Sequence, residues 1–128
     1  MVDKGCRYTK KHEWARKDGD LFTLGISDFA QQELGDIVYV ELPSPGKTVE
    51  AGDAVCSIES VKAVSDVYAP ISGTITEVNQ NLENSPELIN SQPYTEGWIC
   101  RIESSAPEMI EKLLSPEEYE KFLEEESE

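Results

Sequence analysis

The chain has 128 residues, the length of one domain, and its charge is strongly unbalanced. Asp and Glu number 26 against 11 Lys and Arg, which gives a formal net charge of −15 at pH 7. This charge repels phosphate backbones and anionic bilayers, so it argues against nucleic-acid and membrane-surface roles. No apolar run approaches the roughly 20 residues that cross a bilayer, and the N-terminus resembles neither a signal peptide nor a transit peptide. We therefore expect a cytoplasmic chain, or a mature mitochondrial chain without its presequence.

Three cysteines and one histidine leave little material for metal or nucleophilic chemistry. An odd cysteine count without C-x-x-C spacing argues against a disulfide framework or a zinc site. Cys56 and Cys100 lie in apolar, strand-like segments and are expected to be small core residues. His12 alone gives no basis for a metal site or a catalytic triad, and we predict neither.

The first half of the chain predicts strands around one short helix. Residues 8–26 are expected to form a hairpin. Ser27 is expected to cap a helix over residues 28–34, which Gly35 ends. The β-branched content of residues 37–42 predicts a buried strand. Turns are expected at residues 17–20 and 43–47, and residues 48–53 lead into the next hairpin.

Residues 58–70 predict a second hairpin with a lysine at its tip. Pairing Ser60 with Ala63 leaves Val61 and Lys62 as the two turn residues. Neither suits the positive φ of common two-residue turns, so turn propensity does not explain their presence. Strand alternation separates an inward set of side chains from an outward set, namely Cys56, Ile58 and Val67 against Glu59 and Asp66. Lys62 is thereby placed at the most exposed point of a sheet.

Two stretches of the chain are similar to later stretches. Gly35–Val40 resembles Gly73–Val78 at an offset of 38 residues (73 − 35). Val55–Ser60 resembles Ile99–Ser104 at an offset of 44 (99 − 55), which implies an insertion within residues 79–98. Two similar halves predict a pseudo-two-fold pair of small sheets, each of which buries its apolar face against the other.

Residues 105–126 predict two amphipathic helices. Ser105 and Ser115 each precede a glutamate at the third helical position, and Pro116 falls at the first helical position. Apolar residues at helical spacing are expected to face the β core, namely Met109, Ile110, Leu113, Leu114, Tyr119, Phe122 and Leu123. Residues 124–128 are expected to fray. We expect one domain over residues 1–128, with its core at about 8–104 and a helical tail at 105–126.

Several short motifs, in the same order, resemble the glycine cleavage system H protein family. They extend from about Tyr8 to Phe122 and comprise Tyr8–Trp14, Gly25–Ile26, Ala30, Leu34–Val38, Glu41–Pro43, Glu59–Ala63, Tyr68–Gly73, Pro86–Asn90, Pro93–Tyr94 and Gly97–Trp98. The resemblance implies a mainly β fold, a barrel-sandwich hybrid like the lipoyl and biotinyl domains. Such a fold has two small antiparallel sheets with pseudo-two-fold symmetry, to which a short internal helix and C-terminal helices are added.

The resemblance also implies that Lys62 carries lipoic acid in amide linkage. Glu59, Ser60, Val61 and Ala63 complete the attachment motif. A family member is a non-catalytic, monomeric carrier. It takes the aminomethyl group of glycine from a PLP-dependent glycine decarboxylase and delivers it to a tetrahydrofolate-dependent aminomethyltransferase. An FAD-containing dihydrolipoyl dehydrogenase then reoxidises the dithiol, and separate lipoylating enzymes attach the group.

The neighbours of Lys62 separate this family from related carriers. Biotinyl domains have methionines on both sides of the lysine, and the lipoyl domains of 2-oxoacid dehydrogenases usually have an aspartate before it. Glu59 is a candidate for orienting a lipoylating enzyme, or else an ordinary solvent-facing carboxylate. The chain departs from the family pattern at Val64, where a smaller residue or threonine is commoner, while Lys11 is at a variable position.

The loaded arm of the family docks in a surface cleft, and its carried amine is cationic. A carboxylate beside that amine would form a charge-assisted hydrogen bond. Glu13 and Asp66 are the candidates, and the alternative is that they are merely two of 26 acidic residues. Two other functions stay open for the chain: a lipoate relay that donates lipoyl groups to other enzymes, and a structural β module with an unmodified lysine.

Overall fold

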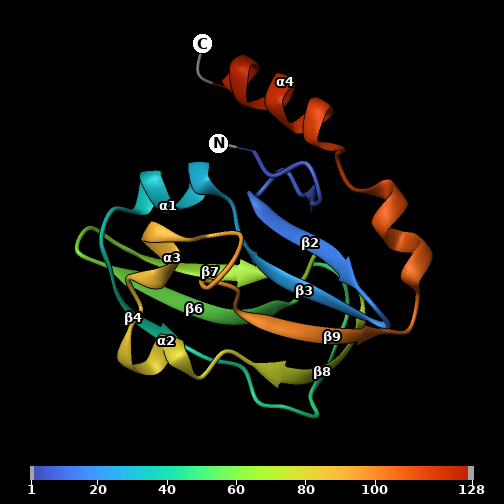
Figure 1. Ribbon diagram of the computed structural model, residues 1–128, viewed down its shortest axis with the longest axis horizontal. Helices are drawn as coiled ribbons and strands as arrows, with labels where there is room; N and C mark the ends of the chain where they lie inside the picture. Colours follow the sequence, from blue (N-terminus) through green and yellow to red (C-terminus); the bar gives the residue numbers. More distant parts are fainter. Residues whose placement is uncertain (1, 127–128) are drawn as a thin grey trace.

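The computed structural model describes residues 2–126 and contains two antiparallel β-sheets (Figure 1). The larger sheet has the strand order β1-β2-β3-β9-β8-β5, and the smaller has the order β4-β6-β7. The strands are β1 (Arg7–Tyr8), β2 (Glu13–Asp18), β3 (Leu21–Ile26), β4 (Ile37–Glu41), β5 (Thr48–Val49), β6 (Ala54–Ser60), β7 (Val64–Tyr68), β8 (Gly73–Val78) and β9 (Cys100–Ser104). The helices are α1 (Asp28–Leu34), α2 (Asn81–Asn84), α3 (Leu88–Ser91), the 3₁₀ helix η1 (Pro107–Lys112) and α4 (Pro116–Glu126). The expected mainly β, two-sheet class is confirmed.

The helix after the N-terminal hairpin forms as the sequence predicts, but the hairpin begins at Glu13 and not at Tyr8, because a turn over residues 9–12 separates β1 from β2. Strands β2 and β3 pair in register, with Trp14 opposite Gly25. A Cβ atom on Gly25 would lie 2.7 Å from the Trp14 indole, so glycine provides the space for this ring. The Ser27 hydroxyl accepts a hydrogen bond from the Ala30 N–H (3.2 Å), which caps α1. Gly35, with φ of 81°, ends the helix in a conformation that favours glycine.

The central hairpin of β6 and β7 has the predicted register. Cys56 lies opposite Val67 and Ile58 opposite Ser65. Ile58 and Val67 are buried, whereas Glu59 and Asp66 on the other face are exposed. The alternation of side chains was therefore sufficient to assign both faces. The turn of this hairpin projects at the end of the molecule where α1 lies (Figure 1).

The two half-units share a β-bulge at equivalent positions. The register of β4 on β6 shifts just after Ile37, and that of β8 on β9 shifts just after Ile75. The offset of 38 residues is thus confirmed (75 − 37). Ile37 pairs with Ser60 and Ile75 pairs with Ile102, so the partner strands are offset by 42 residues (102 − 60). The predicted 44 was wrong, because a shift of two residues leaves the same side chains facing the core and the apolar pattern cannot detect it.

The strand predicted at residues 37–42 is present as β4, but it is buried on one face only. Ile37 and Val40 are buried in β4, but Val38 is 54% and Tyr39 52% exposed. The small sheet covers the core with one face and presents the other to solvent, which is common for antiparallel sheets. High β-branched content predicts a strand without revealing which of its faces is buried.

A large apolar core lies between the sheets, and a smaller aromatic cluster lies beneath α4. The predicted core residues Ile58, Val67, Ile75 and Ile102 are all buried in the large core. The aromatic cluster consists of Cys6, Tyr8, Trp14 and Tyr119. The rings of Tyr8 and Tyr119 stack with centroids 4.2 Å apart and an interplanar angle of 2°, which joins α4 to β1.

All three cysteines are buried as free thiols. Burial raises the pKa of Cys6 and of Cys100 to about 12 in each case, and it raises the pKa of Cys56 as well. Cys56 and Cys100 belong to the large core, as the sequence predicts.

The C-terminal tail confirms one of the two expected caps. The Ser115 N–H donates to Glu118 Oε1 (2.8 Å), and the Glu118 N–H donates to Ser115 Oγ (3.1 Å), which is a capping box with Pro116 first in the helix. Residues 107–112 form a short 3₁₀ helix with no side-chain cap, so the prediction for Ser105 was wrong. The Ser104 hydroxyl instead accepts from the Ala106 N–H (3.1 Å). Helix α4 continues to Glu126, contrary to the expected fraying from residue 124, and residues 127–128 lie outside the described part.

The apolar residues of the tail face the body of the molecule with one exception. Partly buried Ile110 and Leu113 pack on the large core. Leu114, Phe122 and Leu123 pack with Tyr119 on the aromatic cluster. Met109 is half-buried and belongs to neither cluster. Within residues 2–126, no helix combines the length and apolar character needed to traverse a bilayer.

The first prediction concerns the core between the sheets. Ile58→Ala and Ile102→Ala should each lower the free energy of unfolding by about 2–5 kcal/mol, because each leaves a cavity at a fully buried site. Val64→Ala, on the same hairpin but 68% exposed, should change it by less than about 0.5 kcal/mol. Denaturant titration followed by far-UV circular dichroism measures all three. A larger loss for Val64→Ala than for Ile58→Ala would show that the assigned faces are reversed.

Candidate functional site

The lysine hairpin closes through the side chain of Ser60. Its hydroxyl accepts hydrogen bonds from the N–H groups of Lys62 and Ala63, both at 3.1 Å, and the Ser60 N–H donates to the Ala63 carbonyl (2.8 Å). Val61 and Lys62 both keep negative φ, since His12 is the sole non-glycine residue with positive φ in the part described. A serine therefore closes this turn without the glycine that common hairpin turns use.

The tip of the hairpin rests on the junction between α1 and β4. The Val61 N–H donates to the Asp36 carbonyl (3.0 Å). The side chain of Lys62 passes over Gly35, so that a Cβ atom built on Gly35 would lie 3.1 Å from Lys62 Cε. Glycine at this position thus serves two purposes, since it ends α1 with positive φ and leaves space for the lysine stem.

Asn90 of α3 holds this junction in place. Its Oδ1 accepts from the Ile37 N–H (2.8 Å), and its Nδ2 donates to the Gly35 carbonyl and to Gln31 Oε1, both at 2.9 Å. One amide side chain thereby links α1, β4 and α3 below the hairpin. Asn90 belongs to one of the motifs shared with the family, but the motif does not predict these contacts.

A pocket of about 160 Å³ lies beside the hairpin, and both predicted amine-pocket carboxylates line it. Glu13 reaches it from β2 and Asp66 from β7. Its complete lining is Lys11, His12, Glu13, Ile26, Ala30, Glu33, Leu34, Ser65, Asp66 and Val67. Leu34 directly precedes Gly35, over which the Lys62 stem passes, so an arm that extends from Lys62 begins at the rim of this pocket.

Glu13 is the buried charge of the pocket, with 3% of its surface exposed. Its Oε1 accepts from the Thr9 hydroxyl (2.6 Å), and its Oε2 accepts from the Tyr68 N–H (3.2 Å). Burial raises the pKa of this carboxyl, and those hydrogen bonds together with the nearby Lys11 charge oppose the rise. A carboxylate has about four lone-pair positions, so Glu13 can accept a further donor from inside the pocket. Asp66 is exposed at the opening.

Sequence reasoning missed part of this pocket. The ammonium of Lys11 lies 4.2 Å from the centroid of the Tyr68 ring. The sequence did not indicate a role for Lys11, because its position varies in the family that the chain resembles. His12 adopts φ of 75°. Its Nδ1 lies 2.8 Å from the Tyr119 hydroxyl and its Nε2 lies 3.4 Å from Glu126 Oε2, so its ring connects the pocket wall to α4. No short motif signals either contact.

Glu59 lies apart from the pocket, on the solvent face of the small sheet. It pairs with Tyr39 of β4 on one side and with Val64 of β7 on the other. All three side chains are exposed, and they form a row across the sheet beside Lys62. The structure thus brings Glu13 and Asp66 together, whereas Glu59 belongs to the outer surface around the attachment motif.

Two further observations limit the chemistry of the site. Residues 2–126 contain no group of three or more His, Cys, Asp or Glu side chains arranged to hold a metal ion. A larger hollow, of about 670 Å³, lies between Val2 and α4, but it shares no lining residue with the pocket beside the hairpin. A primary amine on a firmly closed turn, next to an acidic pocket, is suited to bearing a covalently attached arm.

Known proteins were compared with the chain and with its structure. The family model for the glycine cleavage H-protein matches residues 6–126. A glycine cleavage system H protein from Carboxydothermus hydrogenoformans is 50% identical over 128 residues, which is 100% of this chain and 98% of that protein. One from Rubrobacter xylanophilus is 58% identical over 120 residues, covering 93% of this chain and 92% of that protein.

The fold agrees with these sequence matches. The crystal structure of a glycine cleavage system H protein from Mycobacterium marinum superimposes with a TM-score of 0.86 at 37% identity, covering 94% of this chain and 97% of that chain. The motifs around Lys62, the two-sheet architecture and a family match over nearly all residues agree with one another. The chain belongs to the glycine cleavage H-protein family.

Proposed function

We propose that Lys62 is the residue at which this lipoyl carrier of the glycine cleavage system bears its lipoic acid. The observation that carries the proposal is the position of the lysine, on an exposed turn that Ser60 closes and at the rim of an acidic pocket. Val61 beside it is 67% exposed, so an attaching enzyme can reach the tip without unfolding the sheet. The carrier is not itself a catalyst.

The attachment chemistry fits the residues at the tip. An amide at Lys62 Nζ removes the lysine charge and produces a long, flexible tether. When attached, the lipoyl group supplies the sulfur that carries the aminomethyl group of glycine. Ser60 and Gly35 keep the base of the tether fixed, and the folded sheets remain unchanged while its far end moves between sites.

Four kinds of partner complete the proposed cycle. A PLP-dependent glycine decarboxylase loads the carrier, and a tetrahydrofolate-dependent aminomethyltransferase unloads it. An FAD-containing dihydrolipoyl dehydrogenase restores the disulfide, and lipoylating enzymes attach the arm. These cofactors perform the harder chemistry in the partners. Exposed Glu59, three residues before Lys62, is proposed to orient a lipoylating enzyme.

We further propose that the pocket shelters the loaded end of the arm. An aminomethyl group on sulfur is open to attack by water, so removal from solvent prolongs its life. Glu13 and Asp66 would receive the cationic amine through charge-assisted hydrogen bonds. The apolar side chains of Ile26, Ala30 and Leu34 line the same pocket and suit the hydrocarbon part of the arm. The carrier is proposed to be monomeric, and to act in the bacterial cytoplasm or the mitochondrial matrix.

Lys62→Arg tests the attachment site. The variant should fold normally, because surface substitutions usually change stability by less than about 0.5 kcal/mol. It should gain no lipoyl mass when incubated with a lipoylating enzyme and should support no glycine cleavage in a reconstituted system. Intact-mass spectrometry provides the first measurement. Lys47→Arg, at an exposed turn lysine elsewhere, should be lipoylated and active. A fully active Lys62→Arg protein would refute the assignment.

Glu13→Gln and Asp66→Asn test the pocket. Both variants should be lipoylated normally, yet their aminomethylated forms should decay several-fold faster, because each loses one charge-assisted hydrogen bond to the amine. Ammonia release in the absence of the transferase measures this decay. Glu103→Gln, an exposed carboxylate of β9 outside the pocket, should decay at the wild-type rate. Identical rates for all four proteins would eliminate the two carboxylates.

A further inference from the structure

Lys11 is held in a fixed backbone position beside the buried carboxylate. Its N–H donates to Thr9 Oγ1 (3.1 Å), and the same hydroxyl group donates to Glu13 Oε1 (2.6 Å). The Glu13 N–H also donates to Thr9 Oγ1 (3.2 Å). One threonine therefore organises the turn that carries both the lysine and the glutamate, and it keeps the two residues near each other.

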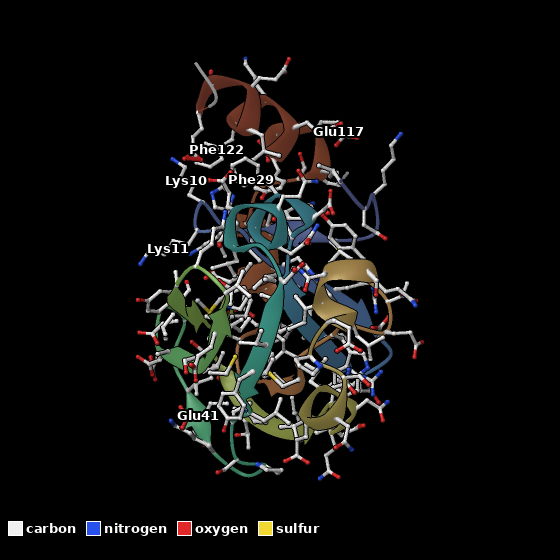
Figure 2. The ribbon with its side chains drawn as sticks, turned by 90° about the vertical axis from the view of Figure 1, so that its left-hand side faces the viewer. Lys10, Lys11, Phe29, Glu41, Glu117 and Phe122 are labelled. Carbon is white, nitrogen blue, oxygen red and sulfur yellow. The ribbon has the colours of Figure 1, made fainter. Side chains whose placement is uncertain are left out.

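The side chain of Lys11 occupies the wall of the pocket. Its ammonium lies 4.2 Å from the centroid of the Tyr68 ring, within the range of a cation–π contact. Tyr68 also donates its backbone N–H to Glu13 Oε2 (3.2 Å). Lys11 and Glu13 thus contact the same residue of β7, the strand that supplies Asp66. Figure 2 shows Lys11 on the flank of the molecule, whereas Lys10 lies higher, near Phe122 of α4.

Lys11 offsets only one of the three carboxylate charges around the pocket. Three carboxylates line it, from Glu13, Glu33 and Asp66, and Lys11 is the cation. His12 lines it too, but burial lowers the pKa of its imidazole, which disfavours the charged form. A carried amine that enters this pocket consequently meets an ammonium group whose charge already acts on the Glu13 carboxylate.

We infer that Lys11 is a built-in counter-cation of the arm pocket, which stabilises the vacant pocket and weakens the docking of a cationic cargo. This inference rests on the proposed role of the pocket. Docking of the carried amine then brings a second positive charge into a pocket that the exposed Lys11 side chain already lines. An uncharged arm meets no such repulsion, so Lys11 shortens the stay of the loaded arm selectively. The carrier thereby protects its cargo without retaining it.

The neighbouring lysine provides a matched control. Lys10 is also exposed, carries the same charge and lies 6.0 Å from the Phe122 ring, outside the pocket lining. Lys11→Gln removes the charge at the pocket, Lys10→Gln removes one beside it, and Lys11→Arg keeps both the charge and the ability to stack on an aromatic ring.

The first measurement needs no arm. In the unlipoylated protein, NMR titration of the Glu13 carboxyl should show a higher pKa in Lys11→Gln than in wild type, because a stabilising positive charge is lost. Lys10→Gln and Lys11→Arg should titrate like wild type. An unchanged Glu13 titration in Lys11→Gln would overturn the counter-cation role.

The second measurement uses the aminomethylated carrier. In Lys11→Gln the ammonia release should slow by about threefold at low salt, the size expected for one partly exposed charge pair, and the difference should shrink at high salt. An unchanged or faster release in Lys11→Gln, with Glu13→Gln still accelerating it, would overturn the inference alone. If Glu13→Gln, Asp66→Asn and Lys11→Gln all leave the release unchanged, the pocket is not the docking site and both proposals fail.

Discussion

Contact between the inner faces of the two sheets is the interaction on which the rest of the structure depends. A three-stranded sheet such as β4-β6-β7 needs an apolar partner surface to persist in water. Ile58 of the small sheet and Ile75 and Ile102 of the large one are completely buried between them. Each such side chain contributes about 1.5–3 kcal/mol through burial, so this contact dominates over the surface ion pairs. The outer face and the tip of the hairpin are left available to partners.

The site beside Lys62 then depends on a few polar contacts at the end of the sheets. Asn90 joins three elements through one amide, and Thr9 joins the N-terminal turn to Glu13. Neutral groups such as these satisfy buried backbone atoms without the desolvation cost of a charge. The turn that carries Lys62 is therefore exposed on its outer side and supported by these contacts on its inner side. The Lys62 side chain can be exposed on an ordered turn because the contacts that support the turn do not involve that side chain.

The sequence predicted those features that local rules control. Alternation assigned the register of the central hairpin, and the Ser27 and Ser115 caps followed from side-chain chemistry at helix starts. It could not predict which face of β4 meets solvent, since that depends on what packs against the strand. It also missed the two-residue difference in the repeat, because such a shift preserves the inward set of side chains.

The candidate site was only partly predictable for a similar reason. Lys62 and its motif are contiguous, and alternation placed Asp66 on the correct face. The pocket combines side chains from the turn before β2, from β2, β3 and α1, and from β7, which follows more than 30 residues after Glu33. The position of Lys11 over Tyr68 and the reach of Asn90 are tertiary contacts, and no spacing rule within one segment reports them.

The burial of all three thiols has a consequence for the proposed dithiolane-bearing arm. Disulfide exchange requires a thiolate that can approach the sulfur–sulfur bond. Cys6, Cys56 and Cys100 are enclosed in the core or in the aromatic cluster, and the raised pKa of each keeps its thiol protonated at neutral pH. The carrier's own cysteine thiols are thus unable to undergo exchange with a sulfur atom of an attached arm. Thiol–disulfide exchange on a lipoyl arm would therefore depend on partner proteins and not on the carrier's own cysteines.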